Sequence, residues 1–419
     1  MKDKKYIYIT LTIVFLLAAL GISYAWFNAV IKGNDTAKEQ SVITGNLELT
    51  FTDDTEVTLP NAVPGDSYTK TISVKNTGTL DAKYNLVWQE LTNEITNDEL
   101  VIEATCKRLN SSNTEEGTCE SISRTPIKSN TIKKNISIEP SVTHEYTIKV
   151  TFLDTGSLQD YNKKKSFSGK LGINEYKLPT SVSFAEDSWE TIVELVKAGK
   201  TDSYNVGDTK TVNMGSYGTH TLRIANKSTP SECSTTGFSQ TACGFVLEFA
   251  DIITKHNMNP AGTYKGTQYD YGWNKDGWPA SSMYTFVNND IYNAIPSEIK
   301  NAIIDTTVVS GHGGTSGETN FTSTDKLYLL SPAEVWANSH NYDTARDNTR
   351  QLDYYKKEGV TTSNYSKAIK MYNSSASGWW LRSAYSDSYK GFYSVNGYGD
   401  WINSPANSTH GVSVAFRLG

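Results

Sequence analysis

The sequence predicts a mainly β protein in which an antiparallel β-sandwich is followed by an α+β domain. Apolar and polar residues alternate with a period of two through much of the first half, which is typical of half-buried strands. In the second half, short strands are mixed with a few helices and long loops. A chain of 419 residues is too long for one ordinary core, so we expect two or three domains.

The composition argues against a nucleic-acid partner. The formal net charge is -6 and charged residues make up 20% of the chain, so no basic surface is expected. Tyrosine is abundant, with 25 residues, and this favours β structure with exposed turns.

Residues 1–25 have the pattern of a secretory signal. Lysines precede an apolar run over residues 6–20, and a small residue follows at Ala25. We expect export and cleavage after Ala25. The competing interpretation is a retained signal anchor, because a helix over residues 6–26 would be just long enough to cross a bilayer. On either interpretation, membrane contact is confined to this segment.

Residues 41–176 are predicted to form the β-sandwich. The clearest alternation covers residues 142–152, and shorter runs cover residues 47–51 and 84–88. A closing strand is expected over residues 167–173. Turn residues separate the runs and no helical pattern appears, so we expect two packed antiparallel sheets.

The four cysteines form two local pairs whose spacing fits neither a C-x-x-C motif nor a zinc site. The pairs are Cys106 with Cys119 and Cys233 with Cys243. In an exported protein we expect two short-range disulfides, and reduced thiols in a cytosolic protein are the alternative. The first pair lies within residues 94–120, which break the strand pattern and are expected to form a surface excursion.

Residues 177–183 are predicted to be a linker and residues 184–419 the second domain. A helix is expected to be capped by Asp187 and to end at Gly199. Further elements are expected: helices that start at Ser282, Pro296 and Ser331, and a buried strand over residues 327–330.

The last forty residues combine a buried frame with a polar, aromatic loop. The frame has the alternation and apolar content of core strands, and its key residues are Trp379, Trp380, Arg382, Phe416 and Arg417. We interpret Arg382 and Arg417 as frame residues in buried ion pairs, with an anionic ligand as the alternative.

Residues 385–410 lie between the two frame strands and are rich in Tyr, Ser, Asn and Asp, as antibody binding loops are. The residues expected to bind a ligand are Tyr385, Tyr389, Tyr393, Asn396, Tyr398, Trp401 and Asn403. The alternative is that these residues only make surface turns.

No catalytic arrangement is readable in the sequence. It has no G-x-S-x-G or H-E-x-x-H motif, and the glycines of residues 311–314 lack the Lys-Ser/Thr of a phosphate loop. His144 falls on the inward phase of its strand and is expected to be a buried histidine without chemistry. We therefore predict no catalytic residue, no metal ligand and no cofactor.

The motifs of the second domain resemble domain-of-unknown-function family 6273. They are the GWWLRS motif at residues 378–383, the GV-x-x-AF-R-L ending at residues 411–418, and stretches at residues 277–283 and 325–334. The resemblance implies a C-terminal domain of secreted proteins from Gram-positive bacteria. More loosely, the ending resembles the C-type-lectin-like and formylglycine-generating-enzyme superfold. Those enzymes use cysteines near the C-terminus, and no cysteine follows Cys243.

The first domain resembles the TasA/camelysin-like sandwich. Pro-Gly-Asp-Ser at residues 64–67 and Val-Lys-Asn-Thr-Gly at residues 74–78 carry this resemblance, and residues 21–27 resemble SipW-type signals. The resemblance implies a surface or matrix protein, and some of these relatives assemble into fibres by strand exchange.

Together these features predict a secreted or cell-surface binding protein of a Gram-positive bacterium. A β-sandwich stalk would present a lectin-like head whose loop binds a surface glycan or protein. The alternative is a structural subunit of a biofilm-matrix or pilus-like fibre that self-assembles through the sandwich.

Overall fold

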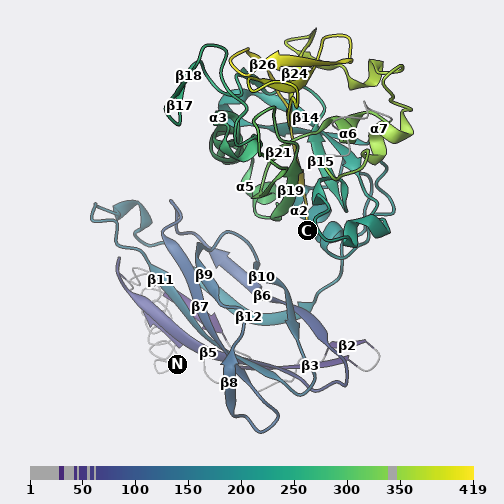
Figure 1. Cartoon of the computed structure of the whole chain (residues 1–419). Coiled ribbons are helices and arrows are strands. Elements are labelled where there is room, and N and C mark those ends of the chain that lie inside the picture. Colours follow the sequence, from purple (N-terminus) through teal and green to yellow (C-terminus); the bar gives the residue numbers. More distant parts are fainter. Residues whose placement is uncertain (1–27, 33–41, 45–46, 54–56, 61–62, 338–346) are drawn as a thin grey trace, which may run out of the picture. The chain divides into compact units, whose positions relative to one another are not determined.

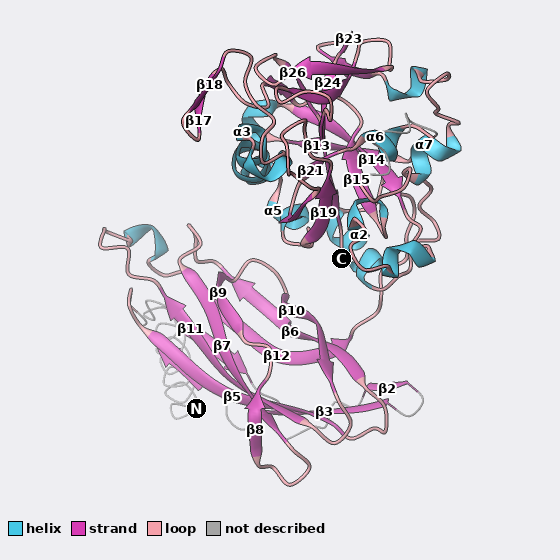
Figure 2. Ribbon diagram, in the orientation of Figure 1, coloured by secondary structure: helices cyan, strands magenta, loops and turns pink. Residues whose placement is uncertain are grey.

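The computed structural model describes residues 28–32, 42–44, 47–53, 57–60, 63–337 and 347–419 (Figure 1). The predicted signal segment, residues 1–25, lies outside them. The protein is mainly β, as predicted, and its strands belong to several antiparallel sheets accompanied by a few short helices (Figure 2). In the described ranges, no helix is both long and apolar enough to cross a membrane.

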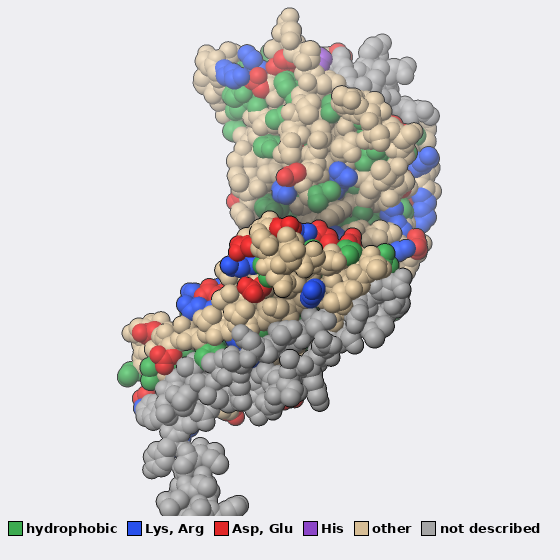
Figure 3. Space-filling model, turned by 90° about the horizontal axis from the view of Figure 1, so that it is seen from below, with side chains coloured by type: hydrophobic (Ala, Val, Ile, Leu, Met, Phe, Trp, Pro, Cys, Tyr) green, Lys and Arg blue, Asp and Glu red, His purple; other side chains and the backbone are tan. Residues whose placement is uncertain are grey.

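The chain divides into two compact units, unit 1 (residues 1–177) and unit 2 (residues 178–419). The boundary falls at the start of the segment predicted to be a linker. Each unit has its own hydrophobic core. Figure 3 shows both basic and acidic side chains on the part of the surface that it presents.

Unit 1 is a β-sandwich. Its five-stranded sheet has the order β10-β6-β12-β1-β4, and its seven-stranded sheet has the order β2-β3-β5-β11-β7-β8 with β9 also on β7. Side chains from both sheets form one core. The strands are β1 (Asn28–Lys32), β2 (Val42–Thr44), β3 (Leu47–Asp53), β4 (Val57–Pro60), β5 (Ser67–Asn76), β6 (Ala82–Asn93), β7 (Leu100–Leu109), β8 (Glu115–Thr118), β9 (Ile122–Pro126), β10 (Thr131–Ile138), β11 (Thr143–Phe152) and β12 (Phe167–Glu175).

The clearest predicted strand is confirmed as β11, which pairs with β5 on one side and β7 on the other. The prediction of a surface excursion over residues 94–120 is wrong for residues 100–109, because β7 is an interior strand of the larger sheet. Leu100, Val101 and Ile102 are all buried although they are consecutive. Burial on both faces therefore removes the period-two signal at the start of the strand.

Unit 2 contains two five-stranded sheets around one core. Their orders are β13-β14-β15-β28-β21 and β16-β27-β24-β25-β26, and three hairpins lie beside them. The strands are β13 (Thr209–Asn213), β14 (Thr219–Asn226), β15 (Val246–Phe249), β16 (Thr254–His256), β17 (Gly262–Tyr264), β18 (Thr267–Tyr269), β19 (Thr306–Ser310), β20 (Phe321–Asp325), β21 (Tyr328–Leu329), β22 (Lys370–Tyr372), β23 (Ser375–Ser377), β24 (Trp379–Ala384), β25 (Gly391–Val395), β26 (Trp401–Pro405), β27 (His410–Val412) and β28 (Val414–Arg417).

The helices of unit 2 are short. They are α2 (Trp189–Lys197), α3 (Ser282–Phe286), a π-turn (Val287–Ile291), α4 (Tyr292–Ala294), α5 (Ser297–Lys300), α6 (Pro332–Val335) and α7 (Asp353–Lys357). The predicted helix starts near Ser282, Pro296 and Ser331 are confirmed, as is the buried strand before Ser331.

The cap of α2 differs from the prediction by one residue. The hydroxyl of Ser188 accepts the N–H of Thr191 at 3.1 Å, so Ser188 and not Asp187 is the N-cap. The carboxylate of Asp187 instead accepts a hydrogen bond from the hydroxyl of Tyr204 at 2.7 Å. It therefore ties the start of the helix to the core.

The predicted frame is the centre of unit 2. Every side chain of β24 is buried, and the indole N–H groups of Trp379 and Trp380 donate to the carbonyl oxygens of Ala368 and His256. Phe416 is fully buried as well. Buried indoles need such partners, so their hydrogen bonds fix the orientation of both rings.

Arg382 and Glu334 form a fully buried ion pair at the centre of this frame. Both guanidinium amino groups reach the carboxylate oxygens at 2.7 Å, and neither side chain is exposed. Further hydrogen bonds run from the guanidinium to the carbonyl oxygens of Val309 and Leu329 and to the hydroxyl of Thr241. The pair therefore connects strands β19, β21 and β24 with helix α6.

Asp347 is a second buried carboxylate near this pair. It accepts hydrogen bonds from the N–H of Gly311 and the hydroxyl of Ser383, both at 2.7 Å, and it is fully buried. Burial raises the pKa of Asp347 to about 6, although the Arg382 charge opposes this shift.

Removing one partner of the Arg382–Glu334 pair should destabilise unit 2 strongly. We expect Glu334→Ala to lower the free energy of unfolding by about 3–5 kcal/mol, because it leaves the guanidinium buried without a counter-charge. The double variant Arg382→Met/Glu334→Leu should lose clearly less. Urea unfolding of the three proteins measures both values, and equal losses in the single and double variants would contradict this account.

Asp347 should make stability depend on pH in a defined window. The folded state keeps a proton on Asp347 between about pH 4 and pH 6, where the unfolded state has lost it, so this carboxyl lowers stability as the pH rises. Asp347→Asn removes this dependence. We expect its unfolding free energy, relative to that of the unmodified protein, to increase by roughly 2 kcal/mol from pH 4 to pH 7. A difference that does not change with pH in urea titrations would show that Asp347 does not titrate in this range.

Candidate functional site

Residues 385–410, the predicted binding loop, consist of a turn and then a β-hairpin. Strands β25 and β26 pair along their length. The side-chain oxygen of Asn396 accepts the N–H groups of Tyr398 and Asp400 and so shapes the turn between them. Strands β25 and β26 are therefore joined by a tight turn that begins at Asn396.

The seven residues expected to bind a ligand differ in exposure. The exposed ones are Tyr389, Tyr398 and Asn403, and the half-buried ones are Tyr385, Asn396 and Trp401. Tyr389 is 57% exposed and Tyr398 is 78% exposed. Only the exposed members present most of a side chain to a partner.

The expectation that Tyr393 is exposed is wrong. Its ring is 4% exposed, because β25 lies between β24 and β26 and all its residues are buried. The rings of Tyr385 and Trp401 pack against it with centroid distances of 5.4 and 5.9 Å. The buried ring of Tyr393 therefore packs against the half-buried rings of Tyr385 and Trp401 and holds them in place.

A second set of aromatic residues lies beside Tyr389 and was not predicted from the sequence. Tyr269, at the end of hairpin β17–β18, approaches Tyr389 with a ring distance of 6.2 Å. Tyr264 stacks on Trp273 at 4.6 Å, and Tyr271 is 54% exposed. We call Tyr264, Tyr269, Tyr271 and Tyr389 the aromatic surface. The sequence feature that could have indicated this surface is the presence of three tyrosines and one tryptophan within residues 264–273.

A cation lies next to the aromatic surface. The ammonium group of Lys390 is 4.5 Å from the ring centroid of Tyr271. On the other side, the hydroxyl of Tyr264 donates to the carboxylate of Asp276 at 2.8 Å, and Lys265 pairs with the same carboxylate. Burial and the Asp276 hydrogen bond raise the pKa of Tyr264, so its phenol remains a neutral donor at neutral pH.

Asn274 holds the loop that carries Tyr389. Its side-chain amide donates to three carbonyl oxygens, those of Tyr385, Ser388 and Gly391, and its own N–H donates to the carbonyl of Tyr389 at 3.0 Å. Asn274 is fully buried. The loop is therefore bound through its backbone.

The glycines of residues 311–314 are required by packing against this loop. A Cβ on Gly313 would lie 2.4 Å from the side-chain oxygen of Asn274, and one on Gly314 would lie 2.9 Å from the carbonyl oxygen of Ser386. Neither neighbour has room to move, because both belong to the hydrogen-bonded loop. Gly313 and Gly314 thus allow the backbone of this segment to lie close to Asn274 and to the loop that carries Tyr389.

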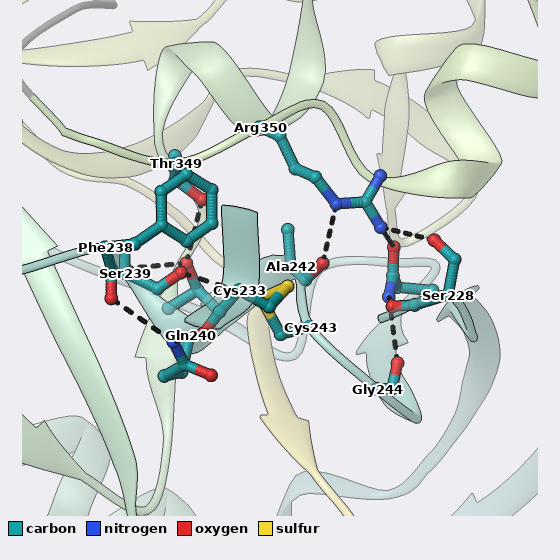
Figure 4. The surroundings of a disulfide bond; sticks show 12 residues. Ser228, Cys233, Phe238, Ser239, Gln240, Ala242, Cys243, Gly244, Thr349 and Arg350 are labelled. Carbon is teal, nitrogen blue, oxygen red and sulfur yellow. Dashed lines mark hydrogen bonds between the residues drawn. A yellow bond between two sulfur atoms is a disulfide. The ribbon is translucent and has the colours of Figure 1, made fainter. Parts of the chain in front are cut away.

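Both predicted cysteine pairs are disulfides in the structure. The Cα atoms are 5.0 Å apart in Cys106–Cys119 and 6.0 Å apart in Cys233–Cys243. Figure 4 shows the second disulfide beside Arg350, whose guanidinium donates to the carbonyl of Ala242 at 3.0 Å. Arg350 also donates to the side-chain oxygens of Asn226 and Ser228, so it links the disulfide loop to the end of β14.

Within the described ranges, one group of three side chains could hold a metal ion, and it consists of Cys106, Cys119 and His144. Those cysteines are joined to each other by a disulfide.

Arg417 is the other arginine that was predicted to belong to the frame. It is half-buried, and burial lowers its pKa.

Two segments of the chain match known families. Residues 250–419 match the model of a domain of unknown function, DUF6273, and residues 7–90 match the model of the camelysin metallo-endopeptidases. These matches confirm the two resemblances that the motifs indicated. The aromatic surface and residues 385–410 lie entirely within the first match.

The camelysin match names a metal-dependent activity of those relatives. Among the side chains described within residues 63–90, no three His, Cys, Asp or Glu residues come together as metal ligands. We derive no catalytic step from this match.

No curated protein matches the chain significantly. Among solved structures, a family 123 glycoside hydrolase from Clostridium perfringens, described for glycolipid glycan hydrolysis, is 17% identical over 29% of this chain and 20% of its own length. The chain thus spans about a fifth of that protein, and the TM-score of 0.17 is too low to support any inference.

Asn274 should be needed for the order of the loop it binds. We expect Asn274→Ala to cost roughly 1–2 kcal/mol of unfolding free energy, because it removes the side-chain hydrogen bonds to three carbonyl groups, each of which keeps one backbone N–H donor. Backbone hydrogen exchange over residues 385–391 should become faster. Asn407→Ala, which removes one long hydrogen bond to Asp270, is the matched control and should change little. Unchanged exchange in the Asn274 variant would contradict this role.

Proposed function

We propose that this chain is a binding protein of the Gram-positive cell surface, and that its second unit binds a glycan through the aromatic surface. The observation that carries this proposal is a set of exposed tyrosine rings supported by a fully buried frame. Tyr271 and Tyr389 are each more than half exposed, whereas Trp379, Trp380 and Arg382 are fully buried.

Rigid support makes exposed rings effective contacts. A tyrosine has few rotatable bonds, and the loop around Tyr389 is already ordered by Asn274, so little entropy is lost on binding. Large aromatic side chains also dominate binding energies where a partner covers them. The surface therefore has the properties of a preorganised contact area.

The chemistry around the rings favours a carbohydrate. The faces of Tyr271 and Tyr389 offer flat apolar area to the C–H face of a sugar ring. Asp270 and Lys390 beside them offer a hydrogen-bond acceptor and donor for sugar hydroxyls. Tyr398 and Asn403, exposed on hairpin β25–β26, would extend the site if the ligand has several sugars.

Export to the cell surface has two independent supports. The N-terminal segment belongs to the camelysin match, and both disulfides require an oxidising compartment to form and persist. Cleavage after Ala25 remains part of the proposal.

A second candidate function is that of a subunit in a biofilm-matrix or pilus-like fibre. The observation that favours it is strand β1, which lies between β12 and β4 and pairs in parallel with β12. The position between β12 and β4 could be filled by strand β1 of another copy of the chain. Such an exchange would join the β-sandwiches of successive copies into a fibre. Electron microscopy of the purified mature protein tests this candidate, since only a fibre former should polymerise.

The tyrosines of the aromatic surface should matter for binding and not for stability. We expect Tyr271→Ala and Tyr389→Ala to weaken glycan binding by about 1–2 kcal/mol each. Their melting temperatures should stay nearly unchanged because the rings are exposed. A glycan array with the full chain identifies the ligand, and calorimetric titration of that ligand into each variant measures the loss. Tyr398→Ala tests whether the site reaches hairpin β25–β26.

Two controls separate binding from folding. Leu158→Ala removes an exposed apolar side chain of unit 1 and should bind normally. Trp380→Ala should lower the unfolding free energy by about 3–5 kcal/mol through the cavity it leaves. If no glycan on the array binds, and a protein partner is found whose binding is weakened by Tyr389→Ala, then the ligand of the aromatic surface is a protein and not a glycan. Normal binding by both tyrosine variants would exclude the aromatic surface.

A further inference from the structure

The first disulfide lies beside a histidine on the seven-stranded sheet of unit 1. Cys106 belongs to β7 and pairs in register with Tyr146 of β11, two residues from His144 on the same strand. Cys119 follows β8, and its N–H donates to the carbonyl of Cys106 at 3.2 Å. Both sulfur atoms and a ring nitrogen of His144 lie within 4.8 Å of one another.

Two of these side chains, Cys119 and His144, line an open cavity, and Cys106 is buried behind them. The cavity has a volume of about 310 Å³, and its lining includes Cys119, His144, Glu120 and Glu139. Cys119 is partly exposed. A small reductant or a hydrated ion can therefore reach the sulfur atoms from solvent.

His144 is prepared to act as a neutral ligand. Its Nδ1 lies 2.9 Å from the hydroxyl of Tyr84, which lies 2.9 Å from the hydroxyl of Tyr146. If Nδ1–H donates to Tyr84, Nε2 keeps its lone pair for a metal, as in metal sites whose histidines are oriented by a second partner.

We propose that reduction of the Cys106–Cys119 disulfide creates a binding site for Zn²⁺ formed by Cys106, Cys119 and His144. Two thiolates and one imidazole are a common zinc ligand set, and three protein ligands leave the fourth position open. Two carboxylates on the cavity wall form ion pairs, Glu120 with Lys133 and Glu139 with Arg108, and Asp81 also lines the cavity, so the fourth ligand is water or the Asp81 carboxylate.

The chemistry balances with an external thiol or phosphine as reductant. A dithiol transfers two electrons and two protons to the disulfide, which gives two cysteine thiols and leaves the dithiol as its own disulfide. Both thiols then release their protons when Zn²⁺ binds. Since Zn²⁺ holds the reduced form, it opposes reoxidation. This site is independent of the aromatic surface and would be a redox-dependent function of unit 1.

The second disulfide provides an internal control. Cys233 and Cys243 do not come together with a histidine or an acidic side chain as metal ligands among the described residues, and Cys243 is fully buried. Reduction there should therefore yield thiols without a third ligand. If the two reduced cysteine pairs differ in metal binding, the difference cannot come from the thiols alone, since both pairs supply two.

The test is a cobalt titration of the full chain under anaerobic conditions. Co²⁺ replaces Zn²⁺ in such sites and gives visible bands when thiolates bind it tetrahedrally. The protein is reduced with a phosphine, which is removed before titration. We expect cobalt bands for the reduced chain and for reduced Cys233→Ser/Cys243→Ser, and none for the oxidised chain or for Cys106→Ser/Cys119→Ser. His144→Gln and Tyr84→Phe should each weaken cobalt binding roughly tenfold or more.

Circular dichroism of every variant shows whether the sandwich remains folded. The proposal is overturned if the folded, reduced chain shows no cobalt bands, or if the bands persist in Cys106→Ser/Cys119→Ser. It is also overturned if folded His144→Gln binds cobalt as tightly as the unmodified protein, because thiols alone would then hold the ion. None of these outcomes bears on glycan binding by unit 2.

Discussion

The buried pair of Arg382 and Glu334 is the interaction on which unit 2 depends. Taking two charges out of water is costly, and the cost is offset only where every polar atom finds a partner. Arg382 achieves this with the two carboxylate oxygens, two carbonyl oxygens and one hydroxyl. Because these partners come from separate elements, the pair fixes the relative positions of β19, β21, β24 and α6. A purely apolar contact at this position would not specify those positions as sharply.

A second buried network acts in the same way on the other side of the core. Glu248 is fully buried and binds both Arg223 and Lys370, and the hydroxyl of Tyr355 donates to it at 2.9 Å. The two cationic partners, together with their hydrogen bonds, lower the pKa of Glu248 to about 2 against the opposing effect of burial. The described ion pairs of unit 1 are mostly exposed and contribute little to its stability. Unit 1 relies on its apolar sandwich core, whereas unit 2 combines an apolar core with buried charges.

The sequence allowed prediction of the elements in which one physical signal dominated. The alternation in β11 and the capping residues near Ser331 are local patterns, and both elements form where expected. Strand β7 was missed because its first three residues are buried on both faces, which hides the period at the start of the strand. Tyr393 was misjudged because its burial depends on β24 and β26, which flank β25 in space. The contact between Tyr269 and Tyr389 joins segments more than a hundred residues apart, so no local pattern could reveal it.

The way Asn274 holds its loop has a consequence for sequence variation. The amide binds carbonyl oxygens, and every amino acid supplies one, so this support does not depend on the side chains of the loop. The side chains at residues 386, 387, 389 and 390 can be exchanged while the loop keeps its path, provided that Asn274, Gly313 and Gly314 remain, with Tyr385 on Tyr393 and the Ser388 hydroxyl on the N–H of Lys390. Unit 2 is thus suited to a combinatorial library at those four positions, and a natural lineage could alter its ligand there without redesigning the core.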